Sequence, residues 1–202
     1  MDKPYHEPLV PDGIYHLFNR AVGSEKLFVC EGNYFFFLNK YFQHTEKICD
    51  TYCYCLLPNH FHFLIRIKSL DKLKLHYEEI KIKQQDFELQ IISDFLMERF
   101  SNWLNSYTKA FNKTTSRKGG LFMDYTKRQK INNDASFGKL IHYIHSNPVH
   151  HGYCQKIEEW KFSSYEEIKS RSNIKLLHDD VLGFFGGVEP FVLFHRQPIH
   201  LK

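Results

Sequence analysis

Long apolar runs are missing from this chain of 202 residues, and its first residues, MDKPYHEPLVPDG, contain no apolar segment of the kind found in secretory signals. No stretch approaches the roughly 20 apolar residues needed to cross a bilayer. The five cysteines include no C-x-x-C pair that would indicate a zinc or redox motif, so reduced thiols are the simplest interpretation. We therefore expect a cytoplasmic protein with no part in the membrane.

Strong net charge, internal repeats and low-complexity tracts are also missing. The net charge is only +4, so overall charge is a weak indicator of any partner. Apolar residues make up 43% of the chain and aromatic residues 16%, which is enough for a substantial core. The length suits one domain with an extension. We expect a catalytic domain over residues 1–170 and a C-terminal extension over residues 171–202 that packs on this domain or on a partner subunit.

Apolar periodicity divides the chain into strands and helices in irregular alternation. Strands are predicted over residues 13–21, 51–57 and 61–68, with Pro58-Asn59 as a turn between the last two. Helices are predicted over residues 33–45, 86–111 and 134–147, with weaker helical character over 70–82 and an extended segment over 121–131. This order favours an α+β fold with a mainly antiparallel sheet and helices packed on one face.

The strand over residues 61–68 carries the first candidate site. Alternation places its apolar residues on one face and His60 and His62 on the other, with Cα atoms roughly 7 Å apart. Two imidazoles at this spacing can converge on one metal ion, and oxygen ligands can complete the shell. Chance H-x-H pairs are common in a chain with 13 histidines. The apolar face is expected to pack on helices, which leaves the histidine face as the more open one.

A second candidate lies on the helix over residues 134–147, which we expect to begin with Asp134 as its N-cap and to end before Pro148. Tyr143 and Asn147 are four residues apart, so their side chains share one flank of the helix. A tyrosine hydroxyl beside an amide that can bind a metal is a specific arrangement. The simpler interpretation is a tyrosine at the edge of the core.

Basic residues gather between positions 113 and 130, where a single acid, Asp124, accompanies them. Such a segment can contact phosphates, although it can equally be a solvated loop. The candidate DNA-binding residues are Lys113, Arg117, Lys118, Lys127, Arg128 and Lys130.

Several segments in the same order resemble one known family. LLPNHFHFLIRI resembles the HUH strand of single-tyrosine transposases, in which U is a bulky apolar residue. HYIHSNPVHHGY and EEWKFSSYEE resemble the tyrosine helix and the segment after it in the branch associated with repetitive extragenic palindromes, called REP. YHLFNRAV, NSYTKAFNK and KGGLF also fit. The resemblance covers residues 13–168.

This resemblance implies a fold, a reaction and a set of roles. The fold would be a ferredoxin-like or RRM-like antiparallel sheet with helices, usually in a homodimer. His60 and His62 would bind Mg²⁺ or Mn²⁺, Asn147 would supply a third ligand, and Tyr143 would be the nucleophile. The enzyme would be a transposase and endonuclease that cleaves single-stranded DNA near hairpins through a 5′-phosphotyrosine link.

Other interpretations stay open at this point. Tyr107 and Tyr125 are the competing tyrosines, the first predicted in the core and the second among basic residues. His142, His145 and His150 lie near Tyr143 in sequence, but none is singled out as a general base. The alternative function is a domesticated protein that binds DNA hairpins without transposition. A sheet-based RNA-binding module would need exposed aromatic residues on the sheet, and an unrelated metal hydrolase would need more acidic ligands near the histidines.

Overall fold

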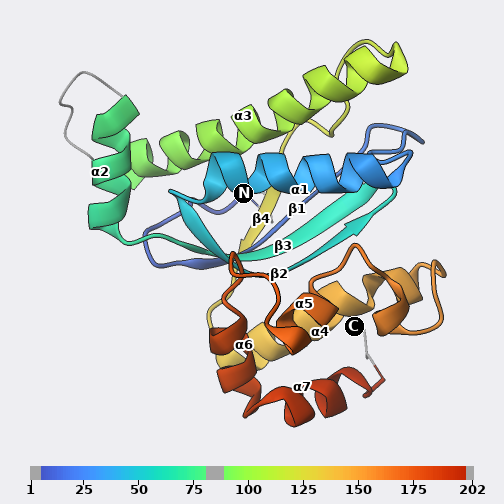
Figure 1. Ribbon diagram of the computed structural model, residues 1–202. Coiled ribbons are helices and arrows are strands. Elements are labelled where there is room, and N and C mark those ends of the chain that lie inside the picture. Colours follow the sequence, from blue (N-terminus) through green and yellow to red (C-terminus); the bar gives the residue numbers. More distant parts are fainter. Residues whose placement is uncertain (1–5, 81–88, 199–202) are drawn as a thin grey trace.

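The sheet forms the centre of the molecule. The computed structural model describes residues 6–80 and 89–198, and the sheet contains β1 (Ile14–Arg20), β2 (Cys49–Leu57), β3 (His60–Ile67) and β4 (Lys127–Lys130). The strands lie in the order β2-β3-β1-β4, and every neighbouring pair is antiparallel (Figure 1). The predicted α+β class with an antiparallel sheet is therefore confirmed.

Three helices lie on one side of the sheet: α1 (Glu31–Thr45), α2 (Leu70–Ile80) and α3 (Leu89–Thr115). The apolar face of β3 packs here, as its alternation predicts, with the Phe61 and Phe63 rings 5.2 and 5.6 Å from the Trp103 ring of α3. The predicted ends of the second and third helices, residues 81–82 and 86–88, lie outside the described residues. Burial of such aromatic rings supplies much of the driving force for folding.

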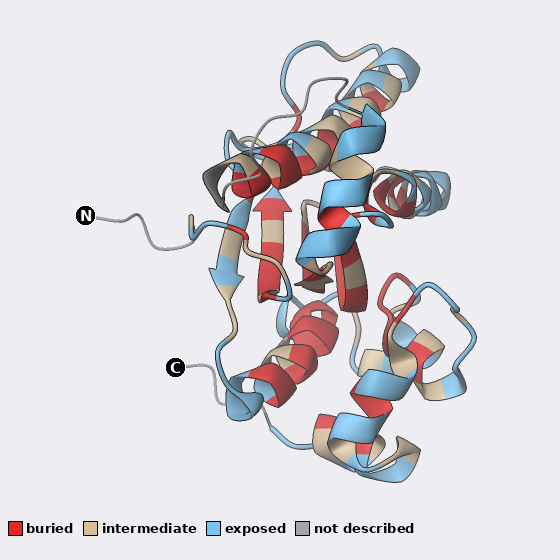
Figure 2. Cartoon of the chain, turned by 90° about the vertical axis from the view of Figure 1, so that its left-hand side faces the viewer, coloured by how far each residue is buried: buried red, intermediate tan, exposed pale blue. Residues whose placement is uncertain are grey.

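The opposite face of β2 and β3 is covered by α4 (Asp134–His150), and beyond it lie η1 (Ile157–Glu159), α5 (Tyr165–Ser170), α6 (His178–Phe185) and α7 (Val188–His195) (Figure 1). Helices were expected on one face of the sheet only, with the histidine face open, whereas α4 lies over the histidine face. In the structure His62 is only 6% exposed, because α4 packs over it. Figure 2 shows the central strands and much of α4 as buried.

The two ends of α4 also differ from expectation. The N-cap is Asn133 rather than Asp134, and its side-chain oxygen accepts a hydrogen bond of 2.8 Å from the Ser136 amide. Pro148 lies inside the helix instead of ending it. Proline removes a single backbone donor, and α4 continues for only two residues beyond it, so the helix tolerates the loss at this end. Asn147 therefore lies within regular helix.

The C-terminal helices pack on α4 and α5. Gly138 of α4 allows a close approach, since a Cβ atom there would lie 2.8 Å from the Phe184 ring of α6. His195 of α7 contacts His145 of α4 at 2.8 Å between ring nitrogens. Among the described residues, no helix combines the length and apolar character needed to cross a membrane. The helices of residues 178–195 thus form a third layer behind α4.

Candidate functional site

His60 and His62 lie where the sequence places them, side by side on the face of β3 that α4 covers. Their ring centroids are 5.2 Å apart and the rings are nearly perpendicular. His62 is opposite Phe18 of β1 and Cys55 of β2 in the sheet register. The strand backbone therefore fixes the positions of both imidazoles from both sides.

Each of these imidazoles uses its Nδ1 atom for a contact within the protein. Nδ1 of His60 lies 2.8 Å from the Asn59 side-chain oxygen, so His60 donates this hydrogen bond and its Nε2 keeps a lone pair when the ring is neutral. Nδ1 of His62 lies 2.9 Å from Nε2 of His16 on β1. If His62 is the donor there, its Nε2 is also available as a ligand.

Tyr143 and Asn147 of α4 reach the same region. The Tyr143 ring centroid lies 5.6 Å from that of His62 and 6.2 Å from that of His16, in edge-on arrangements. Tyr143 is half-buried, so part of its side chain is accessible to solvent. The structure thus brings together the strand pair and the helix tyrosine within a single chain.

Asn147 is 1% exposed, and the two polar atoms of its amide differ in their partners. Its Nδ2 donates to the Tyr143 carbonyl at 2.9 Å, whereas its Oδ1 is buried without a hydrogen bond within the described residues. The Asn147 side chain also lies near enough to His60 to favour the protonated form of that ring. An unsatisfied buried carbonyl oxygen is costly, and a cation between it and the two imidazoles would satisfy it.

The electrostatic surroundings keep these imidazoles neutral. Burial, followed by the charges of His151 and Arg20, lowers the pKa of His60 to about 4. Burial and neighbouring histidines hold the pKa of His62 well below its usual value, and burial lowers the pKa of His16 to about 3. A metal-binding histidine must be neutral, so at pH 7 the site has the required protonation state.

The donor set is two imidazole nitrogens and one amide oxygen. Within residues 6–80 and 89–198, no three histidine, cysteine or acidic side chains converge in a way that could hold a metal ion. The fit of a divalent cation therefore depends on Asn147, with the remaining positions open to water or phosphate oxygens. Such a mixed nitrogen and oxygen set suits Mn²⁺ and tolerates Mg²⁺.

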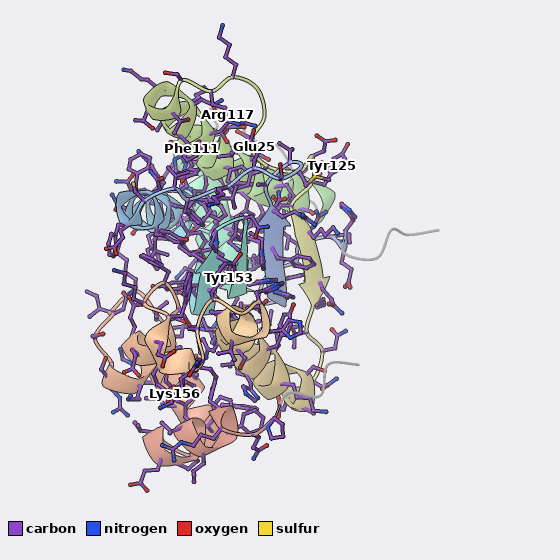
Figure 3. The ribbon with its side chains drawn as sticks, turned by 90° about the vertical axis from the view of Figure 1, so that its right-hand side faces the viewer. Glu25, Phe111, Arg117, Tyr125, Tyr153 and Lys156 are labelled. Atoms are coloured by element: carbon purple, nitrogen blue, oxygen red, sulfur yellow. The ribbon has the colours of Figure 1, made fainter. Side chains whose placement is uncertain are left out.

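The candidate DNA-binding residues divide into separate groups. Arg117 supports its own loop, since it donates to the Gly119 and Gly120 carbonyls and pairs with Glu25 at 3.2 Å. Arg128 donates to the carbonyls of residues 6 and 7. Lys113 and Lys118 are exposed at the far end of α3 and in the loop after it, the end where Figure 3 shows Arg117 and Glu25.

Strand alternation separates the remaining two lysines. Lys127 pairs with Phe18 across β1 and β4, and its Nζ lies 5.9 Å from the Phe18 ring centroid. The Phe18 ring stacks on those of His16 and His62. Lys127 therefore shares the face of the candidate site, whereas Lys130 lies on the opposite face of β4.

The competing tyrosines lie away from the histidine pair. Tyr107 is 1% exposed and donates to the Leu27 carbonyl, which confirms its core position. Tyr125 is 68% exposed, its ring contacts that of His6, and Figure 3 shows it apart from Tyr153. Among the neighbouring histidines, His145 is buried in contacts with Ser164 and His195, and His150 is exposed.

Two residues of the site were missed by sequence reasoning. His16 was passed over because its contact with His62 depends on the pairing of β1 with β3. His151 packs its ring 4.9 Å from that of His60, just beyond the end of α4. The alternation of YHLFNR places His16 and Phe18 on one face, which was the available signal for the first of them.

Comparisons with known proteins bear on the family and the fold of the chain. No protein-family model matches the chain. The chain is 24% identical over 136 residues to a protein of Haemophilus influenzae described as "Putative REP-associated tyrosine transposase". The aligned region covers 64% of this chain and 69% of that protein. It is also similar in fold, with a TM-score of 0.59 and 15% identity, to a solved structure of a REP-associated tyrosine transposase bound to a REP hairpin. That match covers 84% of this chain and 87% of the other. The resemblance inferred from the sequence motifs is confirmed.

Proposed function

We propose that this chain, a relative of the REP-associated tyrosine transposases, is a metal-dependent endonuclease and strand transferase that acts on single-stranded DNA beside hairpins. The observation that carries the proposal is that Tyr143, His62 and His60 lie together near Asn147, whose Oδ1 has no hydrogen-bond partner among the described residues. The hairpin substrate follows from the similar fold of a transposase that was solved with a REP hairpin.

The metal site would use Nε2 of His60, Nε2 of His62 and Oδ1 of Asn147. A bound Mg²⁺ or Mn²⁺ would neutralise the charge that develops on the scissile phosphate. The protein's own contribution is orientation: Asn59 and His16 hold the Nδ1 atoms of the two imidazoles, so the Nε2 lone pairs point away from the sheet partners. Burial keeps both rings neutral and ready to bind.

Tyr143 would act as the nucleophile. Its hydroxyl oxygen attacks phosphorus, a bond from that oxygen to phosphorus forms, and the bond from phosphorus to the 3′ oxygen breaks. The tyrosine proton leaves, and the departing 3′ oxygen takes up a proton, so the products are a 5′-phosphotyrosine link and a free 3′-hydroxyl. Attack by another 3′-hydroxyl reverses the step and joins strands without ATP.

All four residues would come from one chain. Tyr143 lies 5.6 Å from His62, ring to ring, in the same molecule. We also expect a homodimer, as in the family that the chain resembles, and light scattering of the purified protein measures this directly. If the site were shared between two subunits, a mixed dimer of His62→Ala and Tyr143→Phe proteins would contain one intact site. Because we propose that the site is complete in one chain, an equimolar mixture of the two variants should regain little activity.

The test is formation of a covalent adduct. The protein is incubated with Mn²⁺ and single-stranded oligonucleotides that carry a hairpin, and SDS-stable complexes are separated by electrophoresis. We expect an adduct on the 5′ side of the break that EDTA prevents and Tyr143→Phe abolishes. Tyr125→Phe, an exposed tyrosine elsewhere, is the matched control and should keep the adduct. An adduct that persists in Tyr143→Phe overturns the assignment of the nucleophile.

A further inference from the structure

A row of aromatic rings leads away from the histidine pair along the surface. The His151 ring lies 4.9 Å from that of His60, the Tyr153 ring 6.4 Å from that of His151, and the Trp160 ring 5.5 Å from that of Tyr153. His151 and Tyr153 are exposed, the latter at 43%, and Trp160 is half-buried. Figure 3 shows Tyr153 at the junction between the sheet and the second helical layer.

Hydrogen bonds hold the Tyr153 backbone and the Trp160 ring of this row. The Tyr153 amide donates to the Pro148 carbonyl at 2.8 Å, after Gly152 turns the chain with a positive φ of 72°. The Trp160 indole donates to the Leu56 carbonyl of β2 at 3.0 Å, which fixes that ring against the sheet. The Trp160 ring is therefore set in place before any ligand arrives, which lowers the entropic cost of binding at that ring.

The position of the row restricts what it can contact. A strand whose phosphate lies at His60 and His62 has its adjacent nucleotides within reach of His151, because that ring packs directly on His60. Lys156 is exposed, but Figure 3 shows it apart from Tyr153, among the second helical layer, so the rings are the feature that a nearby strand would meet. Solvent-accessible aromatic rings are a usual feature of surfaces that bind single strands.

We propose that His151, Tyr153 and Trp160 form a stacking platform for the unpaired nucleotides next to the scissile phosphate. This inference rests on the proposed function. Stacking needs a base whose face is free, so the platform favours single-stranded over paired DNA and accepts any base. It would keep the strand extended in front of Tyr143 while the hairpin lies elsewhere on the protein.

Tryptophan fluorescence tests the platform directly. The chain has two tryptophans, and Trp103 is fully buried in the core, so quenching by added DNA reports on Trp160. A homothymidine oligonucleotide is titrated into the Tyr143→Phe protein in EDTA, where no cleavage occurs, and binding is followed in parallel by anisotropy of a labelled oligonucleotide. We expect saturable quenching that is lost in Trp160→Phe.

Variants of the middle ring separate stacking from general binding. Tyr153→Ala should weaken binding about fivefold to hundredfold, the range for loss of one base–aromatic stack, and Tyr153→Phe should keep it. Phe36→Ala, at a 38% exposed aromatic position of α1 on the other side of the sheet, is the matched control and should change nothing. Circular dichroism checks that each variant is folded.

The outcomes distinguish the platform from the proposed function. If anisotropy detects binding but Trp160 is not quenched and Tyr153→Ala binds as tightly as Tyr153→Phe, the platform is wrong while DNA binding stands. If neither probe detects binding of the homothymidine strand, the platform is also wrong. In both cases the hairpin adduct remains a separate measurement, and only its absence removes the endonuclease proposal.

Discussion

His145 of α4 and His195 of α7 form a hydrogen bond of 2.8 Å between Nδ1 of the first and Nε2 of the second, across 50 residues of sequence. Nδ1 of His195 faces the Phe191 carbonyl at 2.8 Å and must donate, so its Nε2 accepts from His145. Nε2 of His145 lies 3.0 Å from the Ser164 hydroxyl, and the Tyr54 carbonyl, 3.2 Å away, is a second acceptor for the proton of that hydroxyl. With His195 donating to the Phe191 carbonyl and His145 donating to His195, each ring keeps one N–H and is neutral.

The first prediction is a loss of stability in mild acid. Burial lowers the pKa of His195 to about 3 in the folded protein, against about 6.5 in the unfolded chain. Above pH 6.5 both states are neutral and His195 has no effect. Between pH 6.5 and 3 only the unfolded state takes up the proton, so the free energy of unfolding falls by about 1.4 kcal/mol per pH unit from this residue. Urea unfolding at pH 7, 6 and 5 measures the slope.

A variant isolates the contribution of this residue, since other buried histidines act in the same direction. His195→Gln cannot titrate and should have a shallower dependence on pH than the wild type, together with lower stability at pH 7. Leu193→Gln, at a 60% exposed position of the same helix, should keep the wild-type slope. Equal slopes in the wild type and His195→Gln would contradict the buried neutral assignment.

Sequence periodicity was sufficient for the central parts of the site. A period of two placed His60 and His62 on one face of a strand, and a spacing of four placed Tyr143 and Asn147 on one flank of a helix. These are local relations. That α4 lies over β3, and so brings Tyr143 to His62, was implied by family resemblance and not by either pattern.

Relations between distant segments were beyond the reach of local patterns. The contact of His16 with His62 depends on the register of β1 against β3. The contact of His145 with His195 depends on the packing of α7 on α4. Pro148 was expected to end its helix because interior proline is costly, but the cost is small when only two residues follow. The roles of Arg117 and Arg128 depend on carbonyls that only the folded loops present.

The second prediction concerns His16 as a partner of a metal ligand. Its Nε2 lies 2.9 Å from Nδ1 of His62, and a metal on Nε2 of His62 requires that Nδ1 donate this hydrogen bond to His16. His16→Phe keeps a ring stacked on Phe18 but removes this acceptor, and we expect Mn²⁺ to bind about tenfold to hundredfold more weakly. His16→Gln, which can still accept, should lose less. Calorimetric titration of each folded variant with Mn²⁺ measures these affinities. An unchanged Mn²⁺ affinity in His16→Phe would exclude His16 as a residue that orients the metal ligand His62.

The third prediction concerns the amide oxygen of Asn147, which is buried without a partner among the described residues. Asn147→Ala removes the proposed third ligand. It should weaken Mn²⁺ binding by at least about tenfold, because the loss of a residue that only hydrogen-bonds to a metal ligand already lowers metal affinity by this factor. Asn147→Asp keeps an oxygen and adds charge, so it should bind Mn²⁺ at least as tightly as the wild type. Electron paramagnetic resonance of free Mn²⁺ measures both. Wild-type affinity in Asn147→Ala would place the metal elsewhere.

The fourth prediction uses two lysines on opposite faces of one short strand. Lys127 of β4 lies beside Phe18 on the face of the histidine pair, and Lys130 lies on the other face. A phosphate contact made by Lys127 contributes to the salt dependence of binding, because the contact releases a counterion from the DNA. Lys127→Ala should weaken binding of single-stranded DNA at low salt, and the magnitude of the slope of log affinity against log salt should fall by about 0.7.

Lys130→Ala is the control, because it removes the same charge three residues away, and it should change neither the affinity nor the slope. Anisotropy titrations between 50 and 200 mM salt in EDTA give both slopes. Equal effects of the two substitutions would mean that overall charge, and not the face of the histidine pair, governs binding.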